Sequence, residues 1–492
     1  MTAAQSIGAR TRSPATHAYP MGEAASTSEL GVGGMLIVGY LAITRIGHLS
    51  AAKIGIMIGP VPLFLTELFL IALVLTVAIT RTGSLVVWLV TGGLARMPGL
   101  LLWLLFLTSI LYTLIAFGDW GILAVRDLAI FSYGIVFALT YFVLDSRAKA
   151  AAAMRWFTYS GVVLAVALII DTQSGAQVLF DTATRVVTDS KLLALSFGSG
   201  DVGGIIGFSL MALLAYAASN TERRLLHLGA AAVAFFGLAL TQTRSAVLGM
   251  ALSSLFSLLG MRTTQRLAFV ALAAGGGLLL VATPILLPES GLAHAISSFF
   301  AAVEGGMSLA KDDNFYFRLL RWDAVFELWR DNPLFGVGFG QPLVPAALIN
   351  EVEEGSFNVG LPHNTYLTIL ARLGLFGFVL IIGAWLGSIA LATRAIHRPS
   401  FGGDAFAAAS ALVSMIGFAT FTLFLERPMH AATLWIVAAI ACRLNGPDDD
   451  GQEPQRSQAR GQLFQARAGA ALPLAESGME RARRIAHAKG FR

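Results

Sequence analysis

Three side chains of this 492-residue sequence, His363, Arg318 and Arg244, have types and surroundings that suit group-transfer chemistry. A histidine can accept a proton from a hydroxyl at neutral pH or hydrogen-bond a phosphate. An arginine presents a planar fork of N–H donors that matches a phosphate or diphosphate. Each residue alone also has a structural explanation, as a helix cap, a surface side chain or a residue of the membrane interface.

His363 follows Pro362, which fixes the entry of the chain, and precedes a long apolar run that begins near Asn364. Such a run is typical of a membrane-spanning helix, so its first residues lie near the bilayer surface. We therefore expect the His363 imidazole at the outer mouth of a membrane domain, where it can act as a general base.

Two arginines lie within or between apolar runs, where a charge is costly and therefore suggests a function. Arg244 falls at the junction of two runs and faces lipid headgroups or a cavity. Arg126 lies beside Asp127 within the run Gly121–Leu139. The structural alternative for Arg126 is an ion pair with Asp127, or a side chain that snorkels to the bilayer surface.

Residues 314–331 have the periodicity of an amphipathic helix. One face of this helix carries Arg318, Trp322, Val325 and Trp329. A helix on the membrane surface explains the tryptophans, but it does not require Arg318 on the same face. Asn332-Pro333 ends the helix, and the glycine-rich residues 336–340 that follow allow a close approach of the backbone. They lack the Lys and Ser/Thr of a nucleotide-binding loop.

The composition identifies the elements that must position these residues. The chain is 56% hydrophobic and 13% charged, and its mean hydropathy is +0.72, which is typical of an integral membrane protein. Its net charge is +5, but the basic residues occur in short loops between apolar runs, so we expect no nucleic-acid partner. The single cysteine, Cys442, excludes an intramolecular disulfide.

Apolar runs of about 17–25 residues, long enough to cross a membrane, predict an all-α polytopic membrane protein with about twelve spans. The runs are residues 33–49, 61–80, 98–117, 121–143, 152–170, 201–219, 225–241, 244–260, 266–287, 364–393, 404–425 and 429–444. Residues 33–287 thus hold helices one to nine and residues 364–444 hold helices ten to twelve. A large external loop, residues 288–363, contains the amphipathic helix.

The distribution of lysine and arginine predicts the orientation of the chain. Basic loop residues gather on one side if Ser84–Ala95 does not cross the membrane, so we interpret that segment as interfacial or re-entrant. These residues are Arg81, Arg96, Arg147, Lys149, Arg155, Arg223, Arg224, Arg262, Arg266, Arg394 and Arg398. The tails, a disordered segment 1–32 and a segment 445–492, are then both cytoplasmic, and the long loop faces the other side.

Several motifs occur in a characteristic order. From His363 the sequence reads His-Asn, nine residues, Gly374, two residues, Gly377. The preceding motifs are Arg126-Asp127, Thr243-Arg244-Ser245, Arg318-Leu-Leu-Arg-Trp322 and Asn332-Pro333-Leu334-Phe335-Gly336-Val337-Gly338. Together they resemble the O-antigen ligase and polymerase superfamily, bacterial membrane proteins that include exopolysaccharide polymerases.

The resemblance implies glycosyl transfer at the periplasmic face of the bacterial inner membrane. The donor would be a glycan linked to undecaprenyl diphosphate, and the acceptor a glycan or lipid. It implies catalytic roles for His363, Arg318 and Arg244. Substrate-binding roles follow for Arg126, Arg321, Trp322 and Asn364.

No cluster of His, Asp or Glu at metal-ligand spacing appears in the sequence, so we expect metal-independent chemistry without a cofactor. Asp201 and Glu426 are candidate helpers for His363, with structural pairing as the alternative for both.

The motifs leave ligase and polymerase open, with a slight preference for a polymerase that works with polysaccharide assembly proteins. The alternatives of another class are a flippase or transporter of lipid-linked glycans, and a membrane scaffold without catalysis.

Overall fold

The computed structural model describes most of the predicted membrane domain. The described residues are 31–46, 55–58, 61–90, 97–174, 199–220, 222–241, 243–260, 313–348, 360–398 and 401–446, with isolated positions at 266, 270, 282, 285 and 297. The chain forms two compact units, Met1–Asn445 and Gly446–Arg492. Almost all of the predicted tails and of the ninth span, together with part of the external loop, lie outside the described residues.

Helices make up nearly all of the described chain, which confirms the predicted fold class. Before the external loop they are α1 Gly31–Ile46, α2 Leu65–Val90, α3 Met97–Trp120, α4 Ile122–Ser132, α5 Ile135–Val143, α6 Arg147–Ser174, α7 Ser199–Ser219, α8 Arg224–Thr241 and α9 Arg244–Gly260. From the external loop onward they are α12 Asp313–Asp331, the 3-10 helix η3 Ala346–Leu348, α13 Thr365–Ala395, α14 Gly402–Ala419 and α15 Pro428–Leu444.

Two regions near the N-terminus differ from the sequence analysis. The strands β1 Gly55–Ile58 and β2 Val61–Phe64 pair antiparallel, so the residues predicted to open the second span form a hairpin instead. The apolar residues of both strands flank Gly59-Pro60, a turn-forming pair. Ser84–Val90 continues α2, a single 26-residue helix, and is therefore not a separate segment.

Eleven apolar helical stretches correspond to eleven of the twelve predicted spans. Among the described residues, seven are long enough to cross a membrane: Met97–Trp120, Ile122–Val143, Arg147–Asp171, Val202–Ser219, Arg224–Thr241, Thr365–Ala395 and Gly402–Ala419. Four are shorter: Gly31–Ala42, Leu68–Thr80, Arg244–Leu259 and Met429–Leu444. This pattern is that of a multi-pass membrane protein, and the total of twelve spans stays a prediction.

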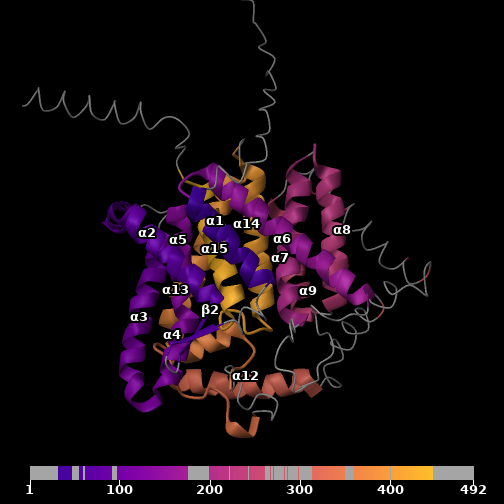
Figure 1. Cartoon of the computed structure of the whole chain (residues 1–492). Helices are drawn as coiled ribbons and strands as arrows, with labels where there is room; N and C mark the ends of the chain where they lie inside the picture. The colour runs from indigo at the N-terminus through magenta and orange to yellow at the C-terminus, as the bar shows by residue number, and fades with distance from the viewer. Residues whose placement is uncertain are drawn as a thin grey trace, which may run out of the picture. The chain divides into compact units, whose positions relative to one another are not determined.

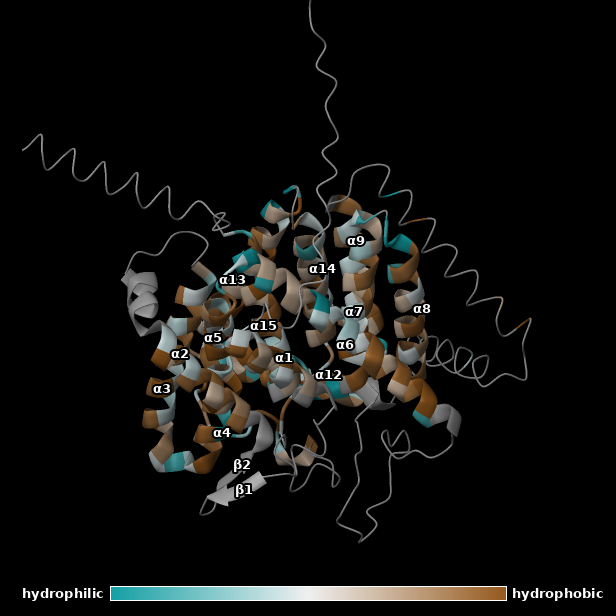
Figure 2. Cartoon of the chain, turned by 45° about the horizontal axis from the view of Figure 1, so that its top comes forward, coloured by the Kyte–Doolittle hydropathy of each residue, from teal (hydrophilic) through white to brown (hydrophobic). Residues whose placement is uncertain are grey.

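The helices differ in which surfaces they bury. α3 and α9 each expose a stripe of leucines at helical spacing, as expected of faces that contact lipid. The two stripes are Leu100, Leu104, Leu107, Leu111 and Leu114, and Leu248, Leu252, Leu255 and Leu259. Figure 2 shows the same hydrophobic character along α3 and α8. α14, in contrast, is buried along almost its whole length.

Small residues allow α14 to lie directly against its neighbours. A Cβ atom at Gly417 would lie 2.7 Å from the Cα of Gly249 on α9, so the two backbones are in contact at this crossing. Such crossings bring membrane helices together through van der Waals packing. α12 does not run with the bundle but lies across its end (Figure 1), where it packs against α13.

Candidate active site

α13 is broken in its first half, at Gly374, where φ is 64° and ψ is −164°. In a continuous helix the N–H groups of Leu375 and Phe376 would donate to the carbonyls of Ala371 and Arg372, four residues earlier. The break separates these two pairs. The two N–H groups and the two carbonyls must therefore find other partners if they are not to be buried unsatisfied.

The loop that follows α12 supplies all four partners. The carbonyls of Pro333 and Leu334 accept from the N–H groups of Leu375 and Phe376, at 2.9 and 3.1 Å. The N–H groups of Val337 and Gly338 donate to the carbonyls of Ala371 and Arg372, at 2.7 and 3.1 Å. Residues 333–338 thus replace the missing helical turn. We call this arrangement of 333–338 with 371–376 the splice.

Glycine is required on both sides of the splice. A Cβ atom at Gly336 would lie 2.4 Å from the carbonyl oxygen of Ala371, and one at Gly374 would lie 2.3 Å from the carbonyl carbon of Leu334. Both glycines also have positive φ, which side chains other than hydrogen disfavour. The glycine motif of the external loop and the one after His363 are therefore two halves of one structural element.

A buried ion pair lies behind the splice. Nη2 of Arg372 lies 3.0 Å from Oδ2 of Asp127, and the two side chains are 1% and 0% exposed. The contact is an ion pair without hydrogen-bond alignment. The same Oδ2 accepts from the N–H of Gly340 at 2.8 Å. Nη1 of Arg372 donates to the carbonyls of Gly338 and Gln341, at 3.2 and 2.6 Å.

Arg126 donates to its neighbour Asp127, with Nε and Nη2 at 3.1 and 2.9 Å from Oδ1. The structure therefore contains the self-paired arrangement that the sequence left open for this dipeptide. Asp127 additionally joins α4 to Arg372 of α13, a long-range contact that the dipeptide alone does not reveal.

α12 contacts the segment that carries His363. The indole N–H of Trp322 donates to the carbonyl of Pro362 at 2.8 Å, and its ring packs 5.5 Å from that of Phe421. Nη1 of Arg318 donates to the carbonyl of Phe421 at 3.1 Å. His363 has φ 54° and is the single non-glycine residue with positive φ in the described part of the chain. Arg318, Trp322 and the His363 segment are thus brought together.

The start of α13 is fixed by the residues next to His363. Asn364 is the N-cap, and its Oδ1 accepts from the N–H of Leu367 at 3.1 Å. The hydroxyl of Thr365 lies 2.9 Å from Oε2 of Glu426 and accepts from the N–H of Phe424 at 2.8 Å. These bonds tie the helix start to the turn between α14 and α15.

Glu426 is the buried carboxylate of this region. Its Oε1 has no hydrogen-bond partner among the described residues. Burial raises the pKa of the Glu426 carboxyl above its usual value, although hydrogen bonds from Thr368 and Thr365 act in the opposite direction. Asp201, the other candidate helper, lies in the first turn of α7, and its side chain lies outside the described part of the molecule.

Arg321 is buried and its guanidinium holds the external loop. Its Nε and Nη2 donate to the carbonyl of Leu348 at 3.0 and 2.7 Å, and the guanidinium carbon lies 4.4 Å from the centre of the Phe317 ring. With 1% of the residue exposed, this geometry favours a positioning role.

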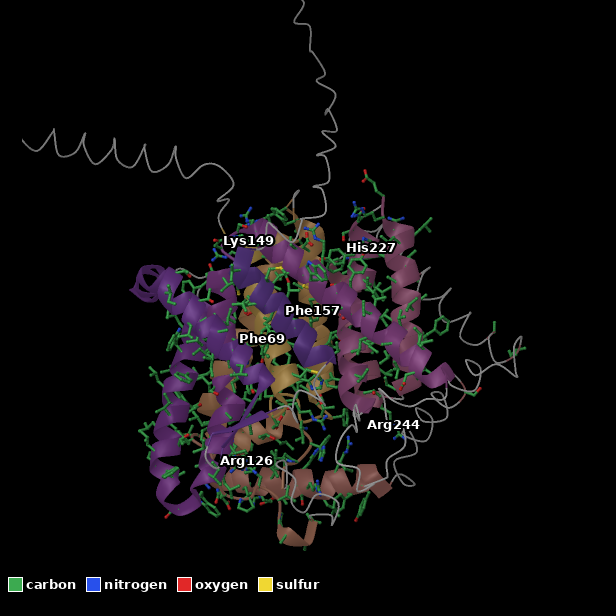
Figure 3. The ribbon with its side chains drawn as sticks, in the orientation of Figure 1. Phe69, Arg126, Lys149, Phe157, His227 and Arg244 are labelled. Atoms are coloured by element: carbon green, nitrogen blue, oxygen red, sulfur yellow. The ribbon has the colours of Figure 1, made fainter. Side chains whose placement is uncertain are left out.

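Arg244 is the first residue of α9 and is exposed. Arg244 and Arg126 lie at the end of the bundle where α12 lies, whereas Lys149 and His227 lie at the opposite end (Figure 3). The structure therefore gathers Arg126, Arg244 and α12 at one end. Among the described residues, no group of three or more His, Cys, Asp or Glu side chains lies close enough to hold a metal ion.

Arg372 is the site residue that sequence reasoning missed. It lies within the predicted span 364–393, and a charge at that depth is itself a functional signal. The sequence indicated Asp127, its partner, only as an ion-pair partner of the neighbouring Arg126.

The array of apolar helices, with a polar site and a transverse helix at one end, defines a polytopic helical membrane protein. Within it, residues 229–382 match the O-antigen ligase family. The matched region runs from α8 through the splice, and it belongs to the O-antigen ligase-like superfamily, as the motifs predicted. The family implies a membrane glycosyltransferase of the O-antigen ligase or polymerase type. No curated protein matches the chain.

Proposed function

We propose that this protein transfers a glycan from undecaprenyl diphosphate to an acceptor hydroxyl, at the membrane face where α12 lies. The observation that carries the proposal is the contact between α12 and the His363 segment, through the Trp322 indole and the Pro362 carbonyl. It sets the Arg318 guanidinium and the His363 imidazole on adjoining elements, as a site that handles both an anionic leaving group and a hydroxyl requires.

The distribution of charge supports the periplasmic face for this site. Basic residues begin α6 and α8 and end α13, at the end of the bundle opposite to α12. They include Arg147, Lys149, Arg223, Arg224, Arg394 and Arg398. Since cytoplasmic loops carry an excess of lysine and arginine, the α12 end would face the periplasm of a bacterial inner membrane, and both termini the cytoplasm.

In the proposed reaction the acceptor oxygen forms a bond to the anomeric carbon of the donor sugar. The bond between that carbon and the diphosphate oxygen breaks, and undecaprenyl diphosphate leaves with the electron pair. His363 takes the proton of the acceptor hydroxyl as general base. Arg318 and Arg244, with Arg126, stabilise the negative charge on the leaving diphosphate, where fixed cations contribute most. No metal ion takes part in this scheme.

The residues around this core have supporting roles in the proposal. Trp322 and Asn364 hold the backbone on either side of His363, and Arg321 holds the loop at η3. The bilayer and the lipid-linked donor are the required partners. We favour a polymerase, for which the acceptor is a growing glycan and polysaccharide assembly proteins are further partners, over a ligase that uses lipid A core.

The test is a transfer assay with purified protein in a defined bilayer. The assay contains an undecaprenyl-diphosphate-linked glycan, an excess of chelator, and either a glycan or a lipid A core acceptor. We expect a longer glycan and free undecaprenyl diphosphate as products with the glycan acceptor. We expect His363→Ala and Arg244→Ala proteins to insert and accumulate normally but to lose transfer.

The alternative classes give different results in the same vesicles. A flippase would move the donor across the bilayer without forming a glycosidic bond, and a scaffold would do neither. Product formed only on lipid A core would identify a ligase. Full activity of both the His363 and Arg244 variants would contradict the proposed site.

A further inference from the structure

We infer that the buried ion pair between Asp127 and Arg372 is a positioning element of the transferase: it holds the splice, and through the splice it sets α12 against His363. This inference rests on the proposed function. It assigns a role to two residues that have none in that proposal, although Asp127 also accepts from Arg126.

The first argument is the destination of the pair's remaining hydrogen bonds. Besides each other, and besides Arg126, which donates to Asp127, the two side chains bond to the backbone of Gly338, Gly340 and Gln341. Gly338 is the last loop residue of the splice, and Gly340 and Gln341 directly follow it. The pair therefore joins α4, α13 and residues 338–341 at one point, and its loss would release these loop residues together with the contact between α4 and α13.

The second argument is the cost of the pair. Removing two charges from water is expensive, and a buried ion pair often stabilises a protein no more than apolar residues of equal volume. The main effect of such an ion pair is then to favour one conformation of the surrounding backbone over others. Here that conformation is the irregular backbone of the splice, in which a broken helix and a loop exchange hydrogen bonds.

The third argument is the mechanical connection to the site. The loop is continuous with α12, which carries Arg318, because α12 ends at Asp331 and the splice begins at Pro333. The other side of the splice is the first segment of α13, which begins directly after His363. A displacement at the splice is therefore a displacement of Arg318 relative to His363.

Aromatic contacts also fix the splice and the residue that follows it. The ring of Phe339 stacks on that of Phe131 with centroids 5.4 Å apart and packs 5.5 Å from that of Tyr112. The hydroxyl of Tyr112 donates to the carbonyl of Phe335 at 2.7 Å. These contacts retain the loop near α3 and α4 when the ion pair is removed, so we expect a loosened site and not an unfolded protein.

The experiment measures kcat, the KM for the donor and backbone amide exchange in bilayer-embedded protein. Asp127→Asn and Arg372→Gln should each lower kcat roughly ten- to hundredfold, with the KM for the donor changed by less than about threefold. The double variant should be no slower than the slower single variant, because each change removes the same interaction. Arg372→Lys, which keeps the charge but not the planar fork, should recover part of kcat.

Amide exchange separates positioning from a general loss of stability. In the Asp127→Asn protein we expect faster exchange in residues 332–341 and unchanged exchange in α14. The matched control is Asp404→Asn, which removes another largely shielded carboxylate, 13% exposed, the one that accepts from the Tyr216 hydroxyl at 2.8 Å. The control should leave kcat and the exchange of 332–341 unchanged.

Three results would overturn the inference: an unchanged kcat in both single variants of an active protein, additive losses in the double variant, or exchange that rises equally in α14. If the wild-type protein transfers no glycan, the proposed function fails, and the exchange measurement alone decides the inference. Faster exchange confined to 332–341 then supports the positioning of α12 by the pair, and unchanged exchange there contradicts it.

Discussion

The two ends of the helix bundle both bury charged and polar side chains, but they use them differently. At the end with Lys149 and His227 polar side chains pair with one another, and arginines donate to carbonyls of the helices, as Arg224 does to Ala217 and Arg443 to Tyr141. The Tyr216 hydroxyl donates to Asp404 at 2.8 Å, and the Tyr159 hydroxyl lies 2.9 Å from Nδ1 of His227. These side chains come from α6, α7, α8 and α14, so they join regular helices to each other.

At the α12 end, beside the pairs of Asp127 with Arg126 and Arg372, arginines donate to carbonyls that lie outside α-helices. Arg318 donates to the carbonyl of Phe421, Arg321 to that of Leu348 and Arg372 to those of Gly338 and Gln341. Positive φ angles also gather along these segments, at His363 and at Gly336, Gly338, Gly340, Gly360 and Gly374.

The difference between the two ends follows from how many backbone hydrogen bonds each region can form within itself. A regular helix bonds its own N–H and C=O groups, so its side chains remain available for each other. A broken helix and a loop leave backbone groups that side chains must satisfy. Irregular backbone is costly and clusters at functional sites, so the contrast supports the proposal that the chemistry takes place at the α12 end.

The largest difference in transfer is expected between substitutions of two histidines, one at each end of the bundle. His363→Asn removes the proposed base but tolerates positive φ better than most residues, so the backbone of the segment should be kept. We expect a loss of transfer of about 10²- to 10⁴-fold, measured as kcat in the bilayer assay. His227→Asn is the control, and we expect its transfer rate to stay within about twofold of wild type. Equal losses in the two variants would remove the functional contrast between the ends.

A second comparison uses two glycines. Gly374→Ala places a methyl group against Leu334 at positive φ, which should cost about 1–3 kcal/mol from backbone strain alone and also disrupt the splice. We expect a lower thermal midpoint and at least tenfold slower transfer. At Gly229 in α8, no atom lies within 4 Å of an added Cβ, so Gly229→Ala should stabilise the helix by up to about 1 kcal/mol. A stable and active Gly374→Ala protein would show that the break in α13 is dispensable.

Local sequence patterns predicted much of the architecture. Each apolar run is long enough to be recognised alone, and all but the ninth fall on described helices. The transverse helix was predicted at 314–331 and lies at Asp313–Asp331, with Val325 fully buried on the expected face. The hairpin at residues 55–64 was missed because its strands merge with the apolar run that follows.

The connections within the site could not be predicted in the same way. A glycine lowers helix propensity by only about 1 kcal/mol, so the run 364–393 is typical of a continuous helix. The break at Gly374 exists because the distant residues 333–338 satisfy the separated backbone groups. Likewise the burial of Arg372 depends on Asp127 in α4. The sequence shows the members of such pairs but not their contact.

A smaller effect should follow from deleting one hydrogen bond at each end. Trp322→Phe removes the bond to the Pro362 carbonyl, which contributes about 0.5–1.5 kcal/mol, and we expect transfer to slow about three- to tenfold. Tyr159→Phe removes the hydroxyl that faces His227 and should leave transfer unchanged. The measurement is kcat of both variants at a temperature at which both are fully folded. A Trp322→Phe protein with the wild-type kcat would mean that this contact does not position His363.

The smallest expected effect concerns Glu426 and appears in stability. Because the pKa of this carboxyl is raised on folding, the folded state binds the proton more tightly than the unfolded state. The group therefore favours folding most below roughly pH 4.3, the ordinary glutamate value. Stability falls as the pH rises from there through the higher pKa of the folded state. In Glu426→Gln this decline should disappear. The thermal midpoint of the variant should therefore rise relative to that of the wild type as the pH increases. Parallel curves for the two proteins would instead indicate that Glu426 is ionised in the folded protein at no cost, which would require a compensating partner for Oε1.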